Sequence, residues 1–465
     1  VQLASPVFVD GFGSPLIPTS VILMQFDNNS SIKQVNKLLV ELDAEPVTEQ
    51  AWDALPNSYK VTSHLKNGFD VIAQSNALTE REDVLFAEPD MIFSGIGHGT
   101  PNDPGFSECW GLHNTGQWGG VVDMDMDSLE SWNITTGDDS ISVLIIDNGV
   151  QQDHPDINQI EGMDFTSDPS TNGGPVNECD NHGTPVAGCV SAIMNNNLGT
   201  LGSAPGVMSV SARCFISNLD CSGGWSAYYS WTADALDWGL GMGARVSNNS
   251  NGYGGTSSAV EAMYTSTRNA GMVHFASAGN ESTSSISYPS ILPTVNSVAA
   301  LDIDGQLASF SNWGTGLAIS APGVWVYSTD RTGSNGYGST DYSYVNGTSF
   351  ASPYSAGVAA LLLSMDASLT AVQVENAIYS SATDLGSAGY DTTYGWGFVN
   401  ANDALNTIVG GCPTDINGDG NVDVEDLLQL IGAWGNAGGD EDLDADGNVG
   451  VNDLLILIAA WGPCP

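Results

Sequence analysis

Ser349 lies where a polar glycine turn, residues 345–353, runs into the apolar segment 354–363. The segment is apolar nearly all round, which predicts a buried helix with Ser349 at or just before its first turn. A hydroxyl beside the unpaired N–H groups of a helix start suits acyl transfer, which needs a nucleophile and an anion-stabilising donor. An ordinary helix-capping serine is the alternative, so the chemistry depends on partners elsewhere in the chain.

A serine nucleophile needs a base that titrates near neutrality, and His182 stands apart among the six histidines. It opens a turn into a run of small residues (His-Gly-Thr-Pro-Val-Ala-Gly, 182–188), which lets an imidazole approach another element closely. An ordinary surface or core histidine is the alternative. Asp147 ends the apolar run 141–146, and an acid at the end of a buried strand is costly unless it has a partner. Such an acid is suited to orienting the base.

Asn280 offers a side-chain amide as a second oxyanion donor. It ends the stretch Ala-Ser-Ala-Gly-Asn (276–280), just beyond another apolar run. Taken singly, Asp147 and Asn280 are equally typical of turns. Their functional interpretation depends on their occurring together and on the elements that position them.

Three continuous apolar runs, residues 141–146, 272–276 and 297–301, are typical of strands buried in a parallel sheet. Helical segments follow most of them. We therefore expect residues 100–410 to form an α/β domain with a mostly parallel sheet and helices on both faces. Functional groups in such folds gather at the carboxyl ends of the strands, where Asp147 and Asn280 are expected.

Residues 1–99 are predicted to form a separate, small α+β domain with its joint. Strands are expected at 21–26, 59–61 and 84–87, and helices at 31–42 and 71–78. The stretch 94–101 is rich in Gly and Pro, so we expect it to be exposed and open to cleavage.

Residues 411–465 contain an internal repeat with a period of 27, in which an acidic loop leads into an apolar helical segment. Each loop offers oxygens at positions 1, 3, 5 and 12 and a glycine at position 6, a spacing specific for Ca²⁺. The candidate ligands are Asp415, Asn417, Asp419, Asn421, Asp423 and Asp426, followed by Asp442, Asp444, Asp446, Asn448 and Asp453. Position 12 is Asp rather than the usual Glu in both loops. A segment as short as 411–465 needs metals or a disulfide to fold, because it cannot bury a large core.

The charge balance is extreme, with nine Lys plus Arg against 54 Asp plus Glu and a net charge of −45. This excludes nucleic acid and anionic membranes as expected partners. No apolar run reaches the roughly 18 residues that a membrane span needs. Solubility in a salty medium and Ca²⁺ binding both explain the acidity. The chain begins with Val1 rather than Met, and we expect a secreted protein whose targeting segment has been removed.

The seven cysteines favour disulfides in an oxidising compartment, because no Cys-x-x-Cys pair suggests zinc. The odd count leaves at least one thiol free, and Cys189, in an apolar segment, is expected to be buried and inert. Cys214 and Cys221 are close enough to staple one loop. Cys412 and Cys464 bracket the last segment of the chain.

Taken together, the motifs closely resemble those of the subtilisin-like serine proteases over residues 101–408. The motifs are Asp-Asn-Gly (147–149), His-Gly-Thr (182–184), Ser-Ala-Gly-Asn (277–280) and Asn-Gly-Thr-Ser-Phe-Ala-Ser-Pro (346–353), in the family's order. The resemblance implies a serine endopeptidase acting on proteins and peptides. Ser349 would attack the carbonyl and His182 would transfer protons. Asp147 would orient His182, and Asn280 would hold the oxyanion.

The same resemblance implies substrate-binding and calcium sites. Ser250, Asn251 and Gly252 match the stretch that pairs with substrate backbone, Gly223 the opposite edge of the cleft, and Ser287 and Tyr288 the wall of the primary specificity pocket. A Ca²⁺ site is implied with the side chains of Asp156 and Asn196 and the carbonyls of Met194, Leu198 and Thr200. An Asn-rich turn is the alternative. Asp123, Asp125 and Asp127 fit either another ion site or a solvated acidic loop. The departures from the family pattern are Asn148, where Thr or Ser is usual, and Ser277, where Ala is usual.

The flanking regions resemble known accessory modules. Residues 1–99 resemble the family's inhibitory propeptide, which implies an inactive precursor until the domain leaves the cleft. Residues 411–465 resemble a dockerin, a small helical module with two calcium loops, which implies a cohesin-like partner. A calcium-stapled structural cap is the alternative for this module. For the whole chain, the rivals to a protease are a latent or structural calcium-binding protein with the same fold, and a binding protein that acts through the repeats.

Overall fold

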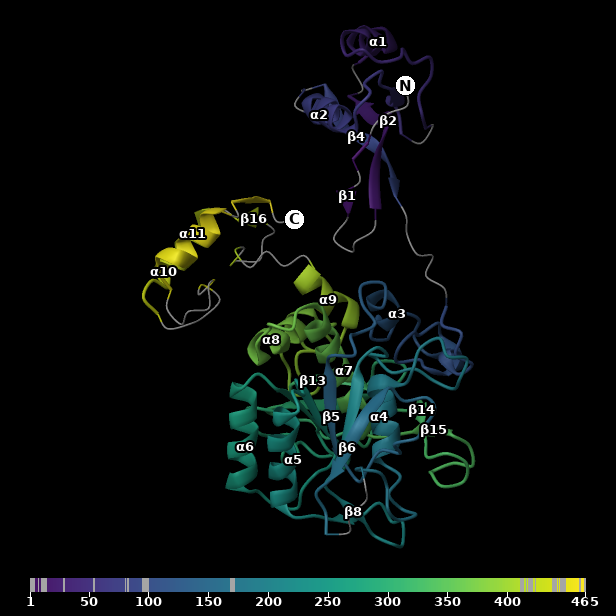
Figure 1. Cartoon of the computed structure of the whole chain (residues 1–465), viewed down its shortest axis with the longest axis vertical. Coiled ribbons are helices and arrows are strands. Elements are labelled where there is room, and N and C mark those ends of the chain that lie inside the picture. Colours follow the sequence, from purple (N-terminus) through teal and green to yellow (C-terminus); the bar gives the residue numbers. More distant parts are fainter. Residues whose placement is uncertain are drawn as a thin grey trace. The chain divides into compact units, whose positions relative to one another are not determined.

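The computed structural model describes most of the chain (Figure 1). The described residues are 5–6, 8–9, 15–27, 30–52, 55–79, 81, 83–93, 100–167, 172–409, 414, 416, 421–422, 424–436, 441, 443, 449–459 and 461–463. The chain divides into two compact units, residues 1–99 and 100–465. The predicted separation of residues 411–465 as a third domain stays a prediction. None of the described helices is long and apolar enough to cross a membrane.

The N-terminal unit is built on β2 (Pro15–Phe26), which pairs antiparallel with all three other strands of its sheet. Those strands are β1 (Phe8–Val9), β3 (Ser58–Thr62) and β4 (Val84–Phe93), and the helices are α1 (Ile32–Glu41) and α2 (Gly68–Thr79). Ser31 caps α1 in a reciprocal pair with Gln34, as a helix-start serine should. The strands and helices predicted for this unit are all present.

The second unit holds a seven-stranded parallel sheet in the order β13-β12-β11-β10-β5-β7-β6. Its strands are β5 (Ser142–Asp147), β6 (Gln159–Asp164), β7 (Met208–Arg213), β10 (Val246–Asn249), β11 (Val273–Ser277), β12 (Asn296–Leu301) and β13 (Ile319–Pro322). The α/β class and the parallel sheet predicted from the sequence are confirmed. Asp147 ends β5, so it lies at the carboxyl edge of the sheet.

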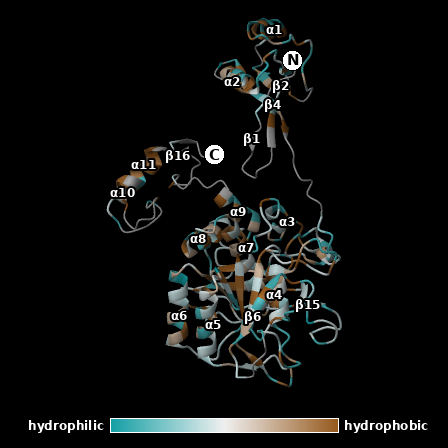
Figure 2. Cartoon of the chain, viewed as in Figure 1, coloured by the Kyte–Doolittle hydropathy of each residue, from teal (hydrophilic) through white to brown (hydrophobic). Residues whose placement is uncertain are grey.

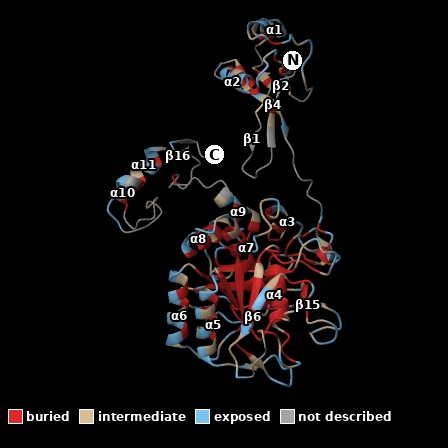
Figure 3. Cartoon of the chain, in the orientation of Figure 1, coloured by how far each residue is buried: buried red, intermediate tan, exposed pale blue. Residues whose placement is uncertain are grey.

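Helices cover both faces of this sheet, which is why the central strand β5 is a continuous apolar run up to Ile146. In β5, Val143 and Ile145 join one core, whereas Leu144 and Ile146 join the other. The first core lies under α4 (Gly183–Ser191), α7 (Thr348–Met365), α8 (Ala371–Ser381) and α9 (Ala401–Val409), and the second under α5 (Tyr229–Gly241) and α6 (Ser258–Asn269). Figure 3 shows the inner strands of the sheet and α7 as the most buried part of the unit, whereas the edge strand β6 is partly exposed.

Shorter elements complete the second unit. They are the 3-10 turns Phe106–Glu108 and Gln117–Gly119, α3 (Ser128–Ser131), the hairpins β8 (Ile216–Ser217) with β9 (Trp225–Ser226) and β14 (Val326–Thr329) with β15 (Tyr342–Val345), and, near the C-terminus, β16 (Asn421–Val422), α10 (Val424–Gly432), α11 (Val451–Ala459) and β17 (Gly462–Pro463). Figure 2 shows hydrophobic residues along α10 and α11. A small core of Val422, Leu430, Ala433, Val449 and Leu457 holds this last part together.

The predicted staple between Cys214 and Cys221 is wrong. Cys179 and Cys221 form the disulfide, while Cys214 is a buried free thiol. The reason is the direction of the strand that precedes them: Cys214 follows β7 directly and faces the core under α5 and α6. Cys221 lies instead on an exposed loop. Cys189 is buried and unpaired, as predicted, and Cys412 and Cys464 lie outside the described residues.

Candidate active site

The carboxylate of Asp147 is fully buried at the end of β5 and is held from several sides. The backbone N–H of Asn148 donates to Oδ1 at 2.7 Å, and the Asn251 side-chain amide donates to Oδ2 at 3.3 Å. These donors stabilise the ionised form of a carboxylate that burial alone would penalise. Asp147 is therefore a fixed negative charge at the carboxyl edge of the sheet.

His182 precedes α4 and faces this charge. Its Nδ1 lies 2.9 Å from both carboxylate oxygens of Asp147. Burial disfavours the imidazolium and is the largest single effect, but the charge of Asp147 and the hydrogen bond to it together raise the pKa of His182 above its ordinary value. The side chain keeps 21% of its exposure, so part of the ring is open beyond the Asp147 contact. An acid–base pair is thus in place.

Ser349 is the second residue of α7 and is 7% exposed. Gly347 takes the helix cap, with a φ of 149° that favours glycine, so the alternative of a capping serine is wrong. The Phe350 ring next to Ser349 lies 5.7 Å from the His182 imidazole, centroid to centroid. The Ser349 hydroxyl donates to the Ser250 carbonyl oxygen at 3.2 Å. Rotation about χ1 would free this hydroxyl for another acceptor, and catalytic hydrogen bonds often tighten only when substrate binds.

Asn280 contacts the first residue of α7 from the loop that follows β11. Its Oδ1 accepts hydrogen bonds from the backbone N–H and the hydroxyl of Thr348, each at 2.9 Å. Anchoring the oxygen in this way fixes the amide plane, so that Nδ2 remains as a donor beside the first turn of α7. Asn280 is exposed, as a group that must meet substrate should be.

The substrate-binding residues predicted from the sequence lie on two strips. Ser250 and Asn251 are buried and Gly252 is exposed directly after β10, while Gly223 is exposed between β8 and β9. The N–H of Ser287 donates to the Ala278 carbonyl, two residues before Asn280, and the Tyr288 carbonyl accepts the N–H of Tyr253 at 2.7 Å. The hydrogen bond between Tyr253 and Tyr288 attaches the predicted pocket wall to the residue that follows Gly252.

A cavity of about 180 Å³ near these strips was missed by the sequence analysis. It is lined by Phe215, Trp225, Ala227, Tyr228, Tyr229, Thr232, Tyr253 and Gly254. Trp225 ends the stretch 222–225, which matches the opposite edge of the cleft, and Tyr253 directly follows the stretch 249–252. The two rings lie 5.9 Å apart. Because Trp225 and Tyr253 lie in or next to those stretches in the sequence, their aromatic side chains were the signal that could have predicted the cavity. The cavity can take a large apolar or aromatic side chain.

The residues of the implied calcium site are brought together. Asp156 is fully buried, and its carboxylate accepts bonds from the Asn196 side-chain amide at 2.6 Å and the Thr200 N–H at 3.1 Å. Burial raises the pKa of Asp156, which marks a carboxylate that a cation would stabilise. Met194 and Leu198 lie in the same loop. The Leu198 N–H donates to Asn196 Oδ1 at 2.8 Å, so Ca²⁺ would fit here only if the Asn196 carboxamide turned its oxygen to the ion.

The calcium loops near the C-terminus fall largely outside the described residues. This holds for Asp415, Asn417, Asp419, Asp423, Asp442, Asp444, Asp446 and Asn448. Asn421 lies in β16. The two position-12 acids, Asp426 and Asp453, are buried in the first turns of α10 and α11, and the Gly450 N–H donates to Asp453 Oδ2 at 2.6 Å. Within the described residues, no group of three or more His, Cys, Asp or Glu side chains gathers as a metal cluster.

An Asp–His pair at the carboxyl edge of a parallel sheet, beside a serine in the first turn of a buried helix, defines a serine hydrolase. Residues 138–397 match the model of the Subtilase family, and the chain belongs to this family of serine endopeptidases. Subtilisin from Bacillus pumilus is 36% identical over 285 residues, which cover 60% of this chain and 96% of that protein. A thermophilic serine proteinase from Bacillus sp. (strain AK1) is 33% identical over 390 residues, 83% of this chain and 86% of that protein. Among solved structures, a protease from Pseudoalteromonas arctica superposes with a TM-score of 0.57 at 28% identity, covering 66% of this chain and 99% of that one.

Proposed function

We propose that Ser349, His182, Asp147 and Asn280 carry the peptidase reaction of a secreted, calcium-dependent endopeptidase made as a self-inhibited precursor. The observation that carries the proposal is the contact between His182 Nδ1 and both oxygens of Asp147 at 2.9 Å. It fixes the tautomer of the imidazole with the proton on Nδ1, so that Nε2 is the basic nitrogen.

The reaction follows from these positions. As a peptide binds, the Ser349 hydroxyl turns from the Ser250 carbonyl to His182 Nε2. Its oxygen forms a bond to the scissile carbonyl carbon while Nε2 takes its proton, and Asp147 stabilises the imidazolium. The tetrahedral intermediate collapses, the C–N bond breaks, and His182 returns the proton to the leaving amine. Water then releases the acyl group by the same steps.

The developing oxyanion is held by Asn280 and by the start of α7. Asn280 Nδ2 and the Ser349 backbone N–H are the expected donors, and the helix start adds a partial positive charge. Because Thr348 already holds the Asn280 oxygen, no reorientation of the amide is needed when charge develops. Such preorganised donors favour the transition state over the ground state.

Extended peptides suit the two strips at residues 249–252 and 222–225, which can take a substrate strand between them. The aromatic cavity beside Trp225 and Tyr253 then receives a large apolar or aromatic side chain of that strand. Ser287 and Tyr288 would form the wall of the primary specificity pocket, as the resemblance implies. Protein and peptide substrates are therefore the expected partners of this face.

Calcium is proposed to stabilise the fold rather than to take part in the reaction. Asp156 and Asn196 supply side-chain oxygens, with the carbonyls of Met194, Leu198 and Thr200 completing the set. A bound cation offsets the cost of the buried Asp156 carboxylate. The acidic loops after residue 414 supply the second group of ligands.

Residues 1–99 are proposed to act as an inhibitory propeptide in cis. All four lysines of the chain lie in this part, at positions 33, 37, 60 and 66, whereas residues 100–465 hold none. These lysines would suit an electrostatic contact with a lysine-free, acidic enzyme, although residues 1–99 also hold 13 Asp plus Glu against five Lys plus Arg. Salt would weaken such a contact. Cleavage in the stretch 94–101 would release the active form.

Residues 411–465 are proposed to dock a cohesin-like partner. The exposed apolar residues of the two repeats recur at the repeat interval: Val424 and Val451, Leu428 and Leu455, Ile431 and Ile458, and Trp434 and Trp461. A structural cap would have no use for a matched apolar face in both repeats, whereas an interaction surface would.

An endopeptidase assay tests the proposed function. The full chain, allowed to process itself, is incubated with an unfolded protein substrate, and new amino termini are counted. We expect internal cleavages by the wild-type chain and none above background with Ser349→Ala. Equal cleavage by both would overturn the assignment of the nucleophile.

A further inference from the structure

Asn148, which directly follows Asp147, departs from the hydroxyl residue usual in the family at this place. It is buried, with 6% of its surface exposed. Its backbone N–H donates to Asp147 Oδ1 at 2.7 Å, and its side chain reaches two other elements. The contacts of the amide oxygen and the amide nitrogen show what this side chain provides here that a hydroxyl could not.

The amide oxygen of Asn148 holds the start of the helix that follows His182. The N–H of Gly183, the first residue of α4, donates to Asn148 Oδ1 at 2.9 Å. The first N–H groups of a helix have no partner within it, and His182, at the cap position, supplies no side-chain acceptor. Asn148 therefore caps α4 from another element, one residue away from His182.

The amide nitrogen of Asn148 reaches the substrate-binding side. It donates to the Ser217 hydroxyl at 3.0 Å. Ser217 ends β8, and the β8–β9 hairpin carries Gly223. One side chain thus joins the residue after the orienting acid, the helix after the base and the edge of the cleft.

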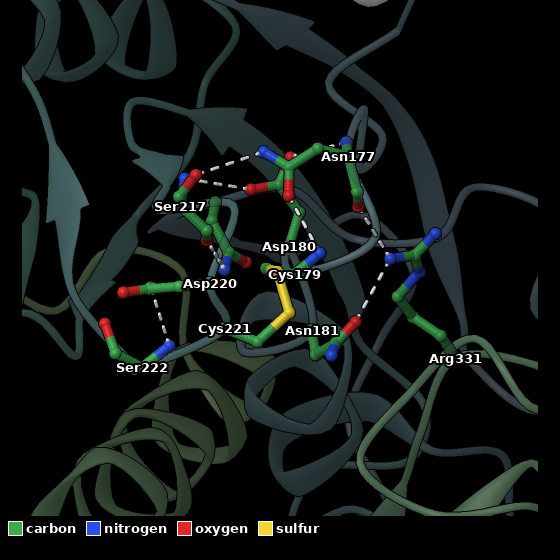
Figure 4. Close-up of a disulfide and its surroundings, with 10 residues drawn as sticks. Asn177, Cys179, Asp180, Asn181, Ser217, Asp220, Cys221, Ser222 and Arg331 are labelled. Atoms are coloured by element: carbon green, nitrogen blue, oxygen red, sulfur yellow. Dashed lines mark hydrogen bonds between the residues drawn. A yellow bond between two sulfur atoms is a disulfide. The ribbon is translucent and has the colours of Figure 1, made fainter.

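The segment before His182 and the hairpin are tied to each other independently (Figure 4). The Ser217 N–H donates to Asp180 Oδ1 at 3.1 Å, and the Asn177 amide donates to the Ser217 carbonyl at 3.3 Å. The Cys179–Cys221 disulfide closes the same pair of loops. The hairpin is therefore a firm attachment point for Asn148.

A buried arginine sets the position of the Asn148 backbone. Arg213 Nε donates to the Asn148 carbonyl at 3.2 Å, and Arg213 Nη2 donates to Asp180 Oδ2 at 3.0 Å. Both Arg213 and Asp180 are fully buried. The planar guanidinium fixes both partners in one geometry, which a lysine could not do.

We propose that Asn148 is a positioning residue, whose amide holds the base-bearing start of α4 in register with both Asp147 and the substrate-binding hairpin. A side chain of this length with an acceptor for the Gly183 N–H and a second polar atom for the Ser217 hydroxyl meets both at once. The proposal rests on the proposed roles of Asp147, His182 and Ser349. It adds a residue that touches neither substrate nor the reacting atoms.

Steady-state kinetics per active site test this role. The self-processed full chain is titrated with a fluorophosphonate, so that only competent molecules are counted, and kcat and KM are measured with a peptide substrate. Asn148→Ala should lower kcat per site about 10- to 100-fold, the loss expected when a reacting group is slightly misplaced. A merely structural role would lower the number of active molecules but leave kcat per site unchanged.

Asn148→Asp is the conservative variant. It keeps an acceptor for Gly183, and the Ser217 hydroxyl can donate to it, so kcat at high pH should return to within about threefold of wild type. The added charge beside Asp147 stabilises the imidazolium, so the acidic limb of kcat should move to higher pH. If Asn148→Ala does not fold, Asn148→Asp provides the test. Full activity of Asn148→Asp with the acidic limb of its kcat profile at the wild-type pH would overturn the proposal.

Asn177→Ala is the matched control. It also loses an amide contact to Ser217, but the hydrogen bonds of Asn177 go to Asp180, Ser217, Cys179 and Arg331 and none to α4. Its kcat per site should stay within about twofold of wild type. Equal losses in Asn177→Ala and Asn148→Ala, or no loss in the latter, would overturn the proposal. A wild-type chain without any turnover would instead refute the proposed function itself.

Discussion

Ser250 and Ser349 are joined by two reciprocal hydrogen bonds. The Ser250 hydroxyl donates to the Ser349 carbonyl oxygen at 2.7 Å, and the Ser349 hydroxyl donates to the Ser250 carbonyl oxygen. Pro353 explains the first bond: it lies four residues after Ser349 in α7 and has no N–H to give to that carbonyl. The residue that starts the predicted substrate strip therefore also fixes the backbone of the proposed nucleophile.

Ser250→Ala should lower kcat about fivefold while changing KM less than twofold. The variant leaves the buried Ser349 carbonyl without its donor, and one neutral hydrogen bond contributes about 1 kcal/mol. Steady-state kinetics with a peptide substrate measure the effect. Ser355→Ala, in the same helix, is the control, because the Ser355 hydroxyl bonds only within α7. Equal kcat values for the two variants would contradict the assigned role of Ser250.

Asn280→Ala should lower kcat about 100- to 1,000-fold with little change in KM, because the lost donor acts on the oxyanion and not on bound substrate. Asn280→Asp is the informative partner variant. It keeps an acceptor for Thr348 but removes the Nδ2 donor, so its kcat should fall as far as that of Asn280→Ala. An Asp variant with near wild-type kcat would show that anchoring Thr348, and not oxyanion binding, is the role of Asn280.

The pH profile of kcat/KM should have an acidic limb with its midpoint above 6.5, the ordinary pKa of histidine. The sign follows from the pair: Asp147 raises the pKa of His182, the reaction needs the neutral imidazole, and activity is therefore lost as pH falls through the raised pKa. Asp147→Asn removes the negative charge, so the acidic limb of kcat/KM, measured on the activity that remains, should move to lower pH. A wild-type midpoint below 6.5 would contradict the geometry.

Removing calcium should lower the thermal unfolding midpoint of the wild-type chain. A ligand at 100 times its Kd stabilises the folded state by about 2.7 kcal/mol. Asp156→Asn should make the transition of the peptidase unit insensitive to chelator, whereas Asp426→Asn should not. Calorimetry with and without chelator measures both. An unchanged wild-type midpoint would show that neither set of candidate ligands binds calcium.

Much of the fold could be predicted, because apolar runs buried on both faces leave an unambiguous pattern. The run that ends in Asp147 is one example, and it alternates between two cores as such a strand must. The position of Ser349 at the start of α7 was equally clear from the change from glycine turn to apolar helix.

The features that could not be predicted depend on direction or on contacts distant in sequence. Whether Gly347 or Ser349 caps α7 depends on a backbone angle. The pairing of Cys221 depends on which way the chain leaves β7, and proximity in sequence suggested Cys214 instead of Cys179. The aromatic cavity has no periodic pattern, because its residues come from a hairpin, a helix start and a loop.

Covalent labelling tests whether Ser349 is a nucleophile that His182 activates. The self-processed chain is treated with a fluorophosphonate, digested, and searched by mass spectrometry for the modified residue, with His182→Ala and Ser349→Ala treated in parallel. We expect a single adduct on Ser349, strongly reduced in His182→Ala and absent in Ser349→Ala. No adduct on Ser349 after residues 1–99 have been released, or an adduct that persists unchanged in His182→Ala, would contradict it.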